Sequence, residues 1–241
     1  MYKFIFLGLL STFVLAACGG GSSSSTPPNN PPPVIDRTGS YTITVTNLTN
    51  AQPLSPIAVI VHDGSFRVFT IGQPASAGLE DLAESGSNAA FIAEANGAGV
   101  LEAASGTGVI PPGANESVSF TVDDENIADL TLSVATMLVN TNDAFTGTNR
   151  MDISVMAVGE TRQTNLIAYD AGTEADTEDA SSIPGPAAGG EGLNAARDDE
   201  ADRVSMHPGV VTSSDGLLTS VLTEQHRFDN PVARLSVTRT D

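Results

Sequence analysis

The chain of 241 residues is poor in cysteine, aromatic residues and cationic residues. It has one cysteine, no tryptophan, and 10 Lys and Arg against 29 Asp and Glu. One cysteine cannot form a disulfide framework, so core packing, with or without a metal, must hold any folded domain. The formal net charge of −19 argues against nucleic acid as a partner and against electrostatic docking on anionic lipid. With 40% hydrophobic residues, a folded domain is favoured over a disordered acidic chain, although a halophilic surface stays an alternative.

Sequence motifs of common enzymes are also missing. The three histidines form no His-Glu-x-x-His motif, and there is no Gly-x-Ser-x-Gly elbow and no Gly-x-x-x-x-Gly-Lys loop. His62, Asp63 and Ser65 are too close in one tight turn to align as a triad. His207, in His-Pro-Gly, is interpreted as a turn residue with a solvated imidazole. We therefore expect no enzyme activity, and an unrecognised exported hydrolase is the third of our functional alternatives.

The N-terminal segment is typical of an exported protein. Residues 1–17 contain Lys3, an apolar run too short to span a bilayer, and small residues before Cys18, so they are predicted to be a signal peptide. Leu15-Ala16-Ala17-Cys18 resembles a bacterial lipobox, in which Cys18 is lipidated and becomes the mature N-terminus. We expect an exported bacterial lipoprotein at the outer membrane or cell surface, held to the membrane by its lipid anchor.

Two further segments follow the signal peptide. Residues 18–37 contain the lipidated cysteine and a Gly/Ser/Pro-rich stretch with almost no apolar side chain, which predicts a tether. Residues 38–241 are long enough for one sizeable domain and short for two.

The domain has mostly the period-two pattern of β-strands. Alternation is clear at residues 41–46, 117–122 and 233–238. Further strand candidates, several of them apolar on both faces, are residues 57–61, 66–71, 130–139, 151–158 and 165–169. Residues 76–95 have helical spacing and contain Gly86, which is expected to split the helix in two. The predicted fold is an all-β, antiparallel β-sandwich of about eight strands with a short helical insertion.

An acidic loop follows the strand candidate at residues 165–169. It contains Asp170 and Glu174, with three more carboxylates within the next five residues, and either a hard divalent cation or full solvation would relieve their repulsion. If residues 130–139 run up, 151–158 run down and 165–169 run up again, the loop with Asp143 and the loop with Asp170 share one end of the sheet. This topology favours a shared cation. Residues 180–200 are expected to form a long loop at the same end.

Several motifs in order resemble the spondin domain of F-spondin, mindin and many bacterial secreted proteins. Tyr169-Asp170-Ala171-Gly172-Thr173-Glu174 is similar to the family's aromatic-Asp-Ala-Gly-Thr-Asp calcium motif, and Asn142-Asp143-Ala144-Phe145 is similar to its upstream Asp-aromatic loop. His62-Asp63-Gly64-Ser65 and the later Ala77-Gly78-Leu79-Glu80 resemble the bacterial branch. The resemblance covers roughly residues 39–241.

The resemblance implies a C2-like β-sandwich that holds Ca²⁺ in the loops at one end, with Asp143, Asp170 and Glu174 as metal ligands. It departs from the family pattern at Glu174, where Asp is usual, and at Phe145, which lies one position later than the family's aromatic residue. The expected function is that of a calcium-binding, envelope-anchored adhesion or binding module for a matrix, glycan or protein ligand. The second alternative is a structural envelope protein whose metal site only stabilises the fold.

Overall fold

The computed structural model describes residues 38–97, 99–123, 128–194, 196 and 201–241. The predicted signal peptide and the tether with Cys18 lie outside the described residues. Within these ranges no helix combines the length and the apolar character that crossing a membrane requires. The described residues from Thr38 onward belong to one compact unit.

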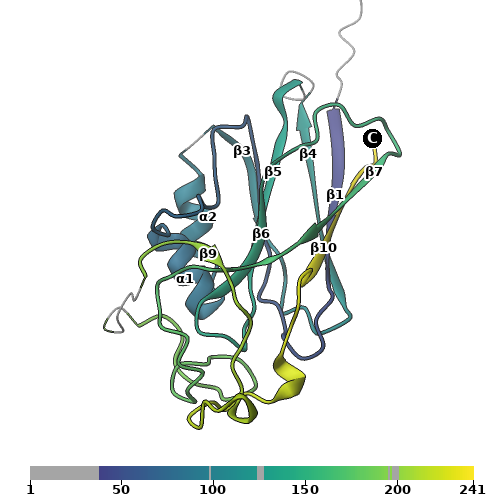
Figure 1. Cartoon of the computed structure of the whole chain (residues 1–241). Coiled ribbons are helices and arrows are strands. Elements are labelled where there is room, and N and C mark those ends of the chain that lie inside the picture. The colour runs from purple at the N-terminus through teal and green to yellow at the C-terminus, as the bar shows by residue number, and fades with distance from the viewer. Residues whose placement is uncertain (1–37, 98, 124–127, 195, 197–200) are drawn as a thin grey trace, which may run out of the picture. The chain divides into compact units, whose positions relative to one another are not determined.

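Two antiparallel sheets form this unit (Figure 1). One has four strands in the order β4-β1-β10-β7, and the other has six in the order β3-β2-β5-β6-β8-β9. The strands are β1 (Thr38–Asn47), β2 (Ala58–His62), β3 (Val100–Ser105), β4 (Asn115–Asp123), β5 (Thr131–Met137), β6 (Ala144–Asp152), β7 (Thr161–Leu166), β8 (Ala168–Asp170), β9 (Ser205–Met206) and β10 (Ala233–Arg239). The predicted antiparallel β-sandwich is confirmed, with ten strands in the described residues instead of about eight.

The main hydrophobic core lies between the two sheets. Tyr41, Ile43 and Val45 on β1 are fully buried there, whereas the threonines between them are partly exposed. Leu132 and Val134 of β5 pack into the same cluster from the six-stranded sheet. Each fully buried side chain of this size stabilises the fold by roughly 1.5–3 kcal/mol. The alternating pattern predicted β1 correctly because only one of its faces lies in this core.

Two short helices cover the other face of the six-stranded sheet (Figure 1). Ser76 caps α1 (Ala77–Ser85), and Gly86 ends it with a φ of 75° before α2 (Ala89–Ala95) begins, as predicted. Ile60 of β2 and Phe145 of β6 pack with these helices in a second core cluster. The central strands of this sheet are therefore buried on both faces, which explains the apolar runs without alternation.

Three strand predictions were wrong or incomplete. Residues 66–71 form no strand, because Val68 donates its backbone N–H to the side chain of Asn149 instead of to a neighbouring strand. The strand predicted at residues 151–158 is found earlier in the chain, as β6. The residues that follow β6 form a turn in which Ile153 and Met156 are buried. Residues 165–169 belong to two strands, because the chain leaves the four-stranded sheet after Leu166 and enters the six-stranded sheet as β8. The pattern also failed to predict β3 and β9.

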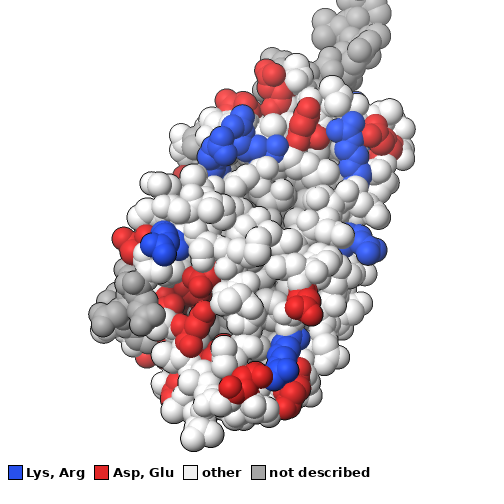
Figure 2. Space-filling model, in the orientation of Figure 1, with Lys and Arg blue, Asp and Glu red and all other residues white. Residues whose placement is uncertain are grey.

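Loops at one end of the unit pack on one another with two 3-10 helices, Ser213–Asp215 and Glu224–His226. Ile183, Val210 and Leu222 are buried together there, so the loop predicted from residue 180 onward does contribute to a small core. Asn142 donates to Ser182 Oγ at 2.8 Å, which holds this loop against the turn before β6, as expected from its predicted position. In Figure 2, acidic side chains gather over this end of the molecule on the face shown.

Candidate metal site

Asp143 and Asp170 meet at one end of the six-stranded sheet. Asp143 is the last residue of the turn between β5 and β6, and the next residue, Ala144, pairs with Asp170 at the end of β8. The turn is shorter than the loop predicted between the strand candidates at residues 130–139 and 151–158, which would span residues 140–150. The two carboxylates nevertheless share one end of the sheet, as the up-down-up strand order predicts, because β6 still runs down and β8 still runs up.

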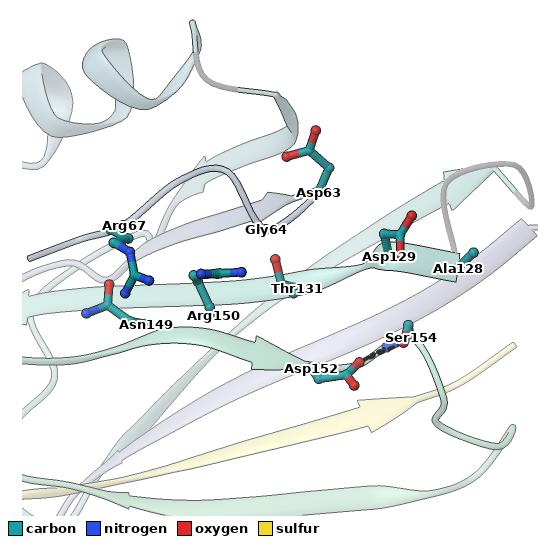
Figure 3. A pocket seen from close by; sticks show the side chains of 10 residues that line it. All are labelled: Asp63, Gly64, Arg67, Ala128, Asp129, Thr131, Asn149, Arg150, Asp152 and Ser154. Atoms are coloured by element: carbon teal, nitrogen blue, oxygen red, sulfur yellow. Dashed lines mark hydrogen bonds between the residues drawn. The ribbon is translucent and has the colours of Figure 1, made fainter.

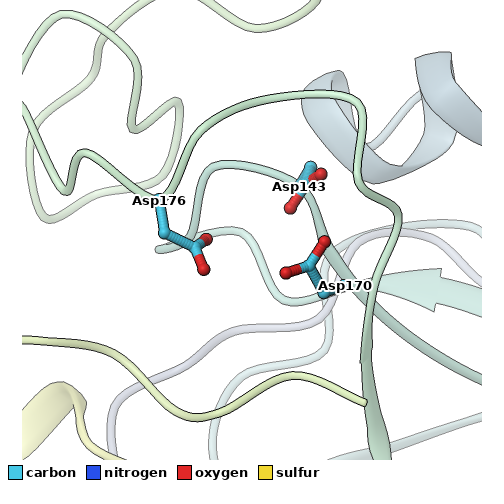
Figure 4. A group of neighbouring side chains, drawn as sticks. All are labelled: Asp143, Asp170 and Asp176. Carbon is cyan, nitrogen blue, oxygen red and sulfur yellow. The ribbon is translucent and has the colours of Figure 1, made fainter. Parts of the chain in front are cut away.

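A third carboxylate completes a group in which one oxygen from each residue lies within 4.8 Å of the others. Its members are Asp143, Asp170 and Asp176, and Figure 4 shows their side chains pointing toward a common space. Asp170 and Asp176 also line a pocket of about 270 Å³, together with Glu174 and residues of the same loop. The site is thus built from a strand end, a tight turn and the acidic loop.

The loop wraps around the buried carboxylate of Asp143. Asp143 Oδ2 accepts hydrogen bonds from the backbone N–H groups of Thr173 at 2.8 Å and Glu174 at 3.1 Å. Gly172 allows this turn, since its φ is 73° and an added Cβ would lie 2.4 Å from the carbonyl oxygen of Arg203. Asp143 Oδ1 is buried without a hydrogen-bond partner among the described residues. A buried polar atom left in this state is costly, and a bound cation would satisfy it.

Burial and mutual repulsion raise the pKa values of the carboxyl groups at this site. Burial, followed by the charge of Asp170, raises the pKa of Asp143 to about 7. The pKa of Asp170 is raised by burial and by the charge of Asp176, and burial raises that of Glu178 to about 7. Each shift means that placing negative charge here is unfavourable without a counter-charge. A divalent cation and a proton therefore compete for these oxygens.

His207 is a part of the site that the sequence interpretation assigned incorrectly. Its side chain is only 1% exposed, so the imidazole is not solvated, and Nε2 lies 3.6 Å from Asp176 Oδ1. Nδ1 accepts a hydrogen bond from the N–H of Gly209 at 2.9 Å, so the neutral ring carries its proton on Nε2. Burial lowers the pKa of His207, but the surrounding carboxylates, Asp176 first, raise it by more. The ring therefore presents an N–H to Asp176 and offers no lone pair for a metal.

Glu174, unlike Asp170, is not one of the carboxylates that converge on Asp143. Glu174 is buried and lines the pocket, but it is outside the group of three converging carboxylates, so its role as a ligand stays a prediction. Asp176 belongs to the acidic run noted in the sequence, where its spacing gave no sign that it turns back toward Asp143. Asp179 lies apart and accepts hydrogen bonds from the N–H and hydroxyl of Ser181.

The donor set fits a hard cation. Carboxylate oxygens from three residues, with backbone carbonyls in an irregular loop, are typical of Ca²⁺ sites, whereas zinc sites use His or Cys nitrogen and sulfur ligands. His207 is the one histidine beside the group in the part of the chain that the structure describes, and its N–H faces the carboxylate. The buried oxygen of Asp143 that has no hydrogen-bond partner among the described residues is an atom that either a cation or a proton would satisfy.

Comparison with known proteins assigns the chain to a family. No curated protein matches the sequence. The sequence model of the Spondin_N family matches residues 47–185, a range that runs from the end of β1 to beyond Asp176 and covers more than half of the chain. The match thus contains all three converging carboxylates. The chain belongs to the Spondin_N family.

Proposed function

We propose that the domain binds one Ca²⁺ through Asp143, Asp170 and Asp176 and serves as a calcium-dependent binding or adhesion module on a bacterial envelope. The observation that carries the calcium assignment is the convergence of these carboxylates around the buried Oδ1 of Asp143, which has no hydrogen-bond partner in the described ranges. Three negative charges then face two positive ones, and water and backbone carbonyls complete six to eight oxygen ligands. The expected dissociation constant is of the order of 10⁻⁴ to 10⁻³ M, as in extracellular modules.

Calcium is favoured over magnesium by the irregularity of the site. Mg²⁺ requires a near-ideal octahedron and releases its water reluctantly, whereas Ca²⁺ accepts oxygens at varied angles. The ligands here come from a turn, a strand end and a loop, so no regular geometry is built in.

The envelope location and the binding role rest on the sequence and on family membership. A lipidated Cys18 and an extended tether would hold the domain away from the membrane, where its loops can contact matrix, glycan or protein. The spondin fold and the missing catalytic motifs support a binding module over an enzyme.

Calcium is expected to stabilise a domain that is already folded. The two core clusters packed around the six-stranded sheet stabilise the fold by more than one bound ion does. The metal-free protein should therefore keep a β-type circular dichroism spectrum. At 10 mM Ca²⁺, binding with the expected affinity should raise the free energy of unfolding by about 1.4–2.7 kcal/mol, which corresponds to a rise in Tm of roughly 3–10 °C. Thermal melts with Ca²⁺, Mg²⁺ and chelator measure this. A random-coil spectrum in chelator, or a Tm that calcium leaves unchanged, would contradict the proposal.

Recovery of envelope or matrix material separates the binding module from a purely structural protein. The immobilised full-length protein should retain such material in calcium and release it in chelator, because the ion orders the loops that make the contact. Asp179→Asn removes a charge outside the group of three carboxylates and serves as the control. It should retain the material in calcium and release it in chelator, as wild type does. If the protein retains nothing in either condition while calcium still raises its Tm, the ion only stabilises the fold and the structural alternative holds.

A further inference from the structure

A second pocket lies at the opposite end of the six-stranded sheet from the acidic site. It is bordered by the start of β5, the end of β6 and the turn after β2, and its volume is about 520 Å³. Two arginines, Arg67 and Arg150, line it, and neither forms an ion pair with any described residue. Two guanidinium groups that have no carboxylate partner among the described residues and share one pocket are unusual in a chain with 29 acidic and 10 basic residues.

A β-bulge directs Arg150 into this pocket. Leu132 pairs with Met151 and Val134 with Thr148, so β6 carries one extra residue at this point. Arg150 has a φ of 50°, a left-handed conformation that costs a residue with a side chain about 1–2 kcal/mol. Bulges of this kind reorient side chains and are frequent beside functional sites.

Buried hydrogen bonds hold the bulge in place. Arg150 donates its backbone N–H to Ser133 Oγ at 3.1 Å, and the same oxygen lies 3.0 Å from Nε2 of the fully buried His62. His62 Nδ1 accepts from the N–H of Gly64 at 3.0 Å. The guanidinium of Arg150 lies against Gly64, where an added Cβ would be 3.3 Å from Nη2. The turn and the arginine are thus fixed relative to each other.

Asn149 holds the second arginine beside the first. Its Oδ1 accepts from the N–H of Val68 at 2.7 Å and its Nδ2 donates to the carbonyl of Phe69 at 3.0 Å. These are the two residues that follow Arg67, so the segment with Arg67 is fastened to β6 next to Arg150. These hydrogen bonds fix the backbone at both arginines, and both side chains are exposed.

Hydrogen-bond acceptors line the rest of the pocket. Figure 3 shows Asp129 and Asp152 on the side away from Arg67, with Asp63 on the turn above. Hydrogen bonds from Ser65 and Ser154 lower the pKa values of Asp63 and Asp152, so both stay ionised acceptors. These carboxylates would repel negative charge on their own side of the pocket, but they accept hydrogen bonds from hydroxyl groups. No aromatic residue lines the pocket, which excludes a flat apolar ligand.

We propose that this pocket binds a hexuronic acid, that is, a sugar whose carboxylate is held by Arg67 and Arg150 and whose hydroxyl groups donate to the aspartates. A guanidinium matches a planar carboxylate with two parallel hydrogen bonds, and a volume of about 520 Å³ is within the range of small-molecule sites. The proposal does not depend on the metal site, which lies at the other end of the sheet.

Binding of matched monosaccharides to the full-length chain tests this assignment. Galacturonate should bind and shift the Nε resonances of the pocket arginines in NMR spectra, and galactose, which lacks only the carboxylate, should bind at least tenfold more weakly. Arg150→Gln should weaken galacturonate binding by about tenfold or more, since it removes a charged hydrogen-bond pair. Arg234→Gln, at an exposed arginine on β10, should have no effect.

Any one of four results would overturn the proposal. Equal affinities for galacturonate and galactose would remove the role of the arginines. Equal affinities for galacturonate and acetate would leave only an anion site, and tighter binding of glycine would identify a zwitterion site instead. Loss of binding in Arg234→Gln as in Arg150→Gln would indicate a general effect of charge and not of this pocket.

Discussion

Asp170→Asn and Asp176→Asn are each expected to weaken calcium binding by at least about thirtyfold. Asp170 and Asp176 are half-buried, and removing one partner from a charged contact that has lost its water costs roughly 2–5 kcal/mol, which corresponds to a factor of about thirty or more. Both side chains converge with Asp143, and asparagine keeps their shape while it removes the charge. Starting from a dissociation constant of the order of 10⁻⁴ to 10⁻³ M, a thirtyfold loss should leave the variants far from saturation in a calorimetric titration.

Two further variants test which residues belong to the calcium site. Asp179→Asn should bind calcium like wild type, because Asp179 lies apart and makes its hydrogen bonds to Ser181. Glu174→Gln separates the ligand set expected from the family motif from the group found in the structure. If Glu174→Gln lowers the calcium affinity as much as Asp170→Asn does, Glu174 is a ligand. If Asp176→Asn leaves the calcium affinity unchanged, Asp176 is not part of the site.

Asp170→Asn also tests calcium binding as a whole. Circular dichroism spectra in chelator should be the same for wild type and variant, so that any lost affinity reflects the site and not the fold. Equal calcium affinities of Asp170→Asn and wild type would refute the assignment.

Cys18→Ala is expected to release the protein from the membrane fraction completely. Stable anchoring takes more than one acyl chain, which a processed lipoprotein carries on its N-terminal cysteine. The acidic chain is not attracted to anionic lipid, so electrostatic attraction would not hold the variant at the membrane. Cell fractionation and immunoblotting measure the change.

The anchor prediction also has a matched control. Ser22→Ala lies in the same tether and leaves the cysteine intact, so it should stay in the membrane fraction. If Cys18→Ala stays there as wild type does, the lipid anchor is not at Cys18. Gly19 follows the cysteine where an inner-membrane retention signal would usually place Asp, so wild type should fractionate with the outer membrane.

The sequence by itself determined the class of fold and brought together two residues of the site, Asp143 and Asp170. Alternation on β1, β4 and β10 was sufficient because each of these strands has one face in the core and one in water. The helical spacing of residues 76–95 and the break at Gly86 predicted the two helices, because both signals are local in the sequence. The strand order then placed Asp143 and Asp170 together, because antiparallel neighbours return to the same edge.

Only the tertiary structure decided the strand bounds in the six-stranded sheet and the third acidic member of the site. Strands buried on both faces lose the alternation that marks their ends, and the step of the chain from β7 to β8 leaves no local pattern at all. Asp176 joins Asp143 because the loop folds back through Gly172 and the backbone bonds of Thr173 and Glu174, and His207 reaches it from a distant loop. Such contacts depend on how separate loops pack together, and spacing along one chain does not record that packing.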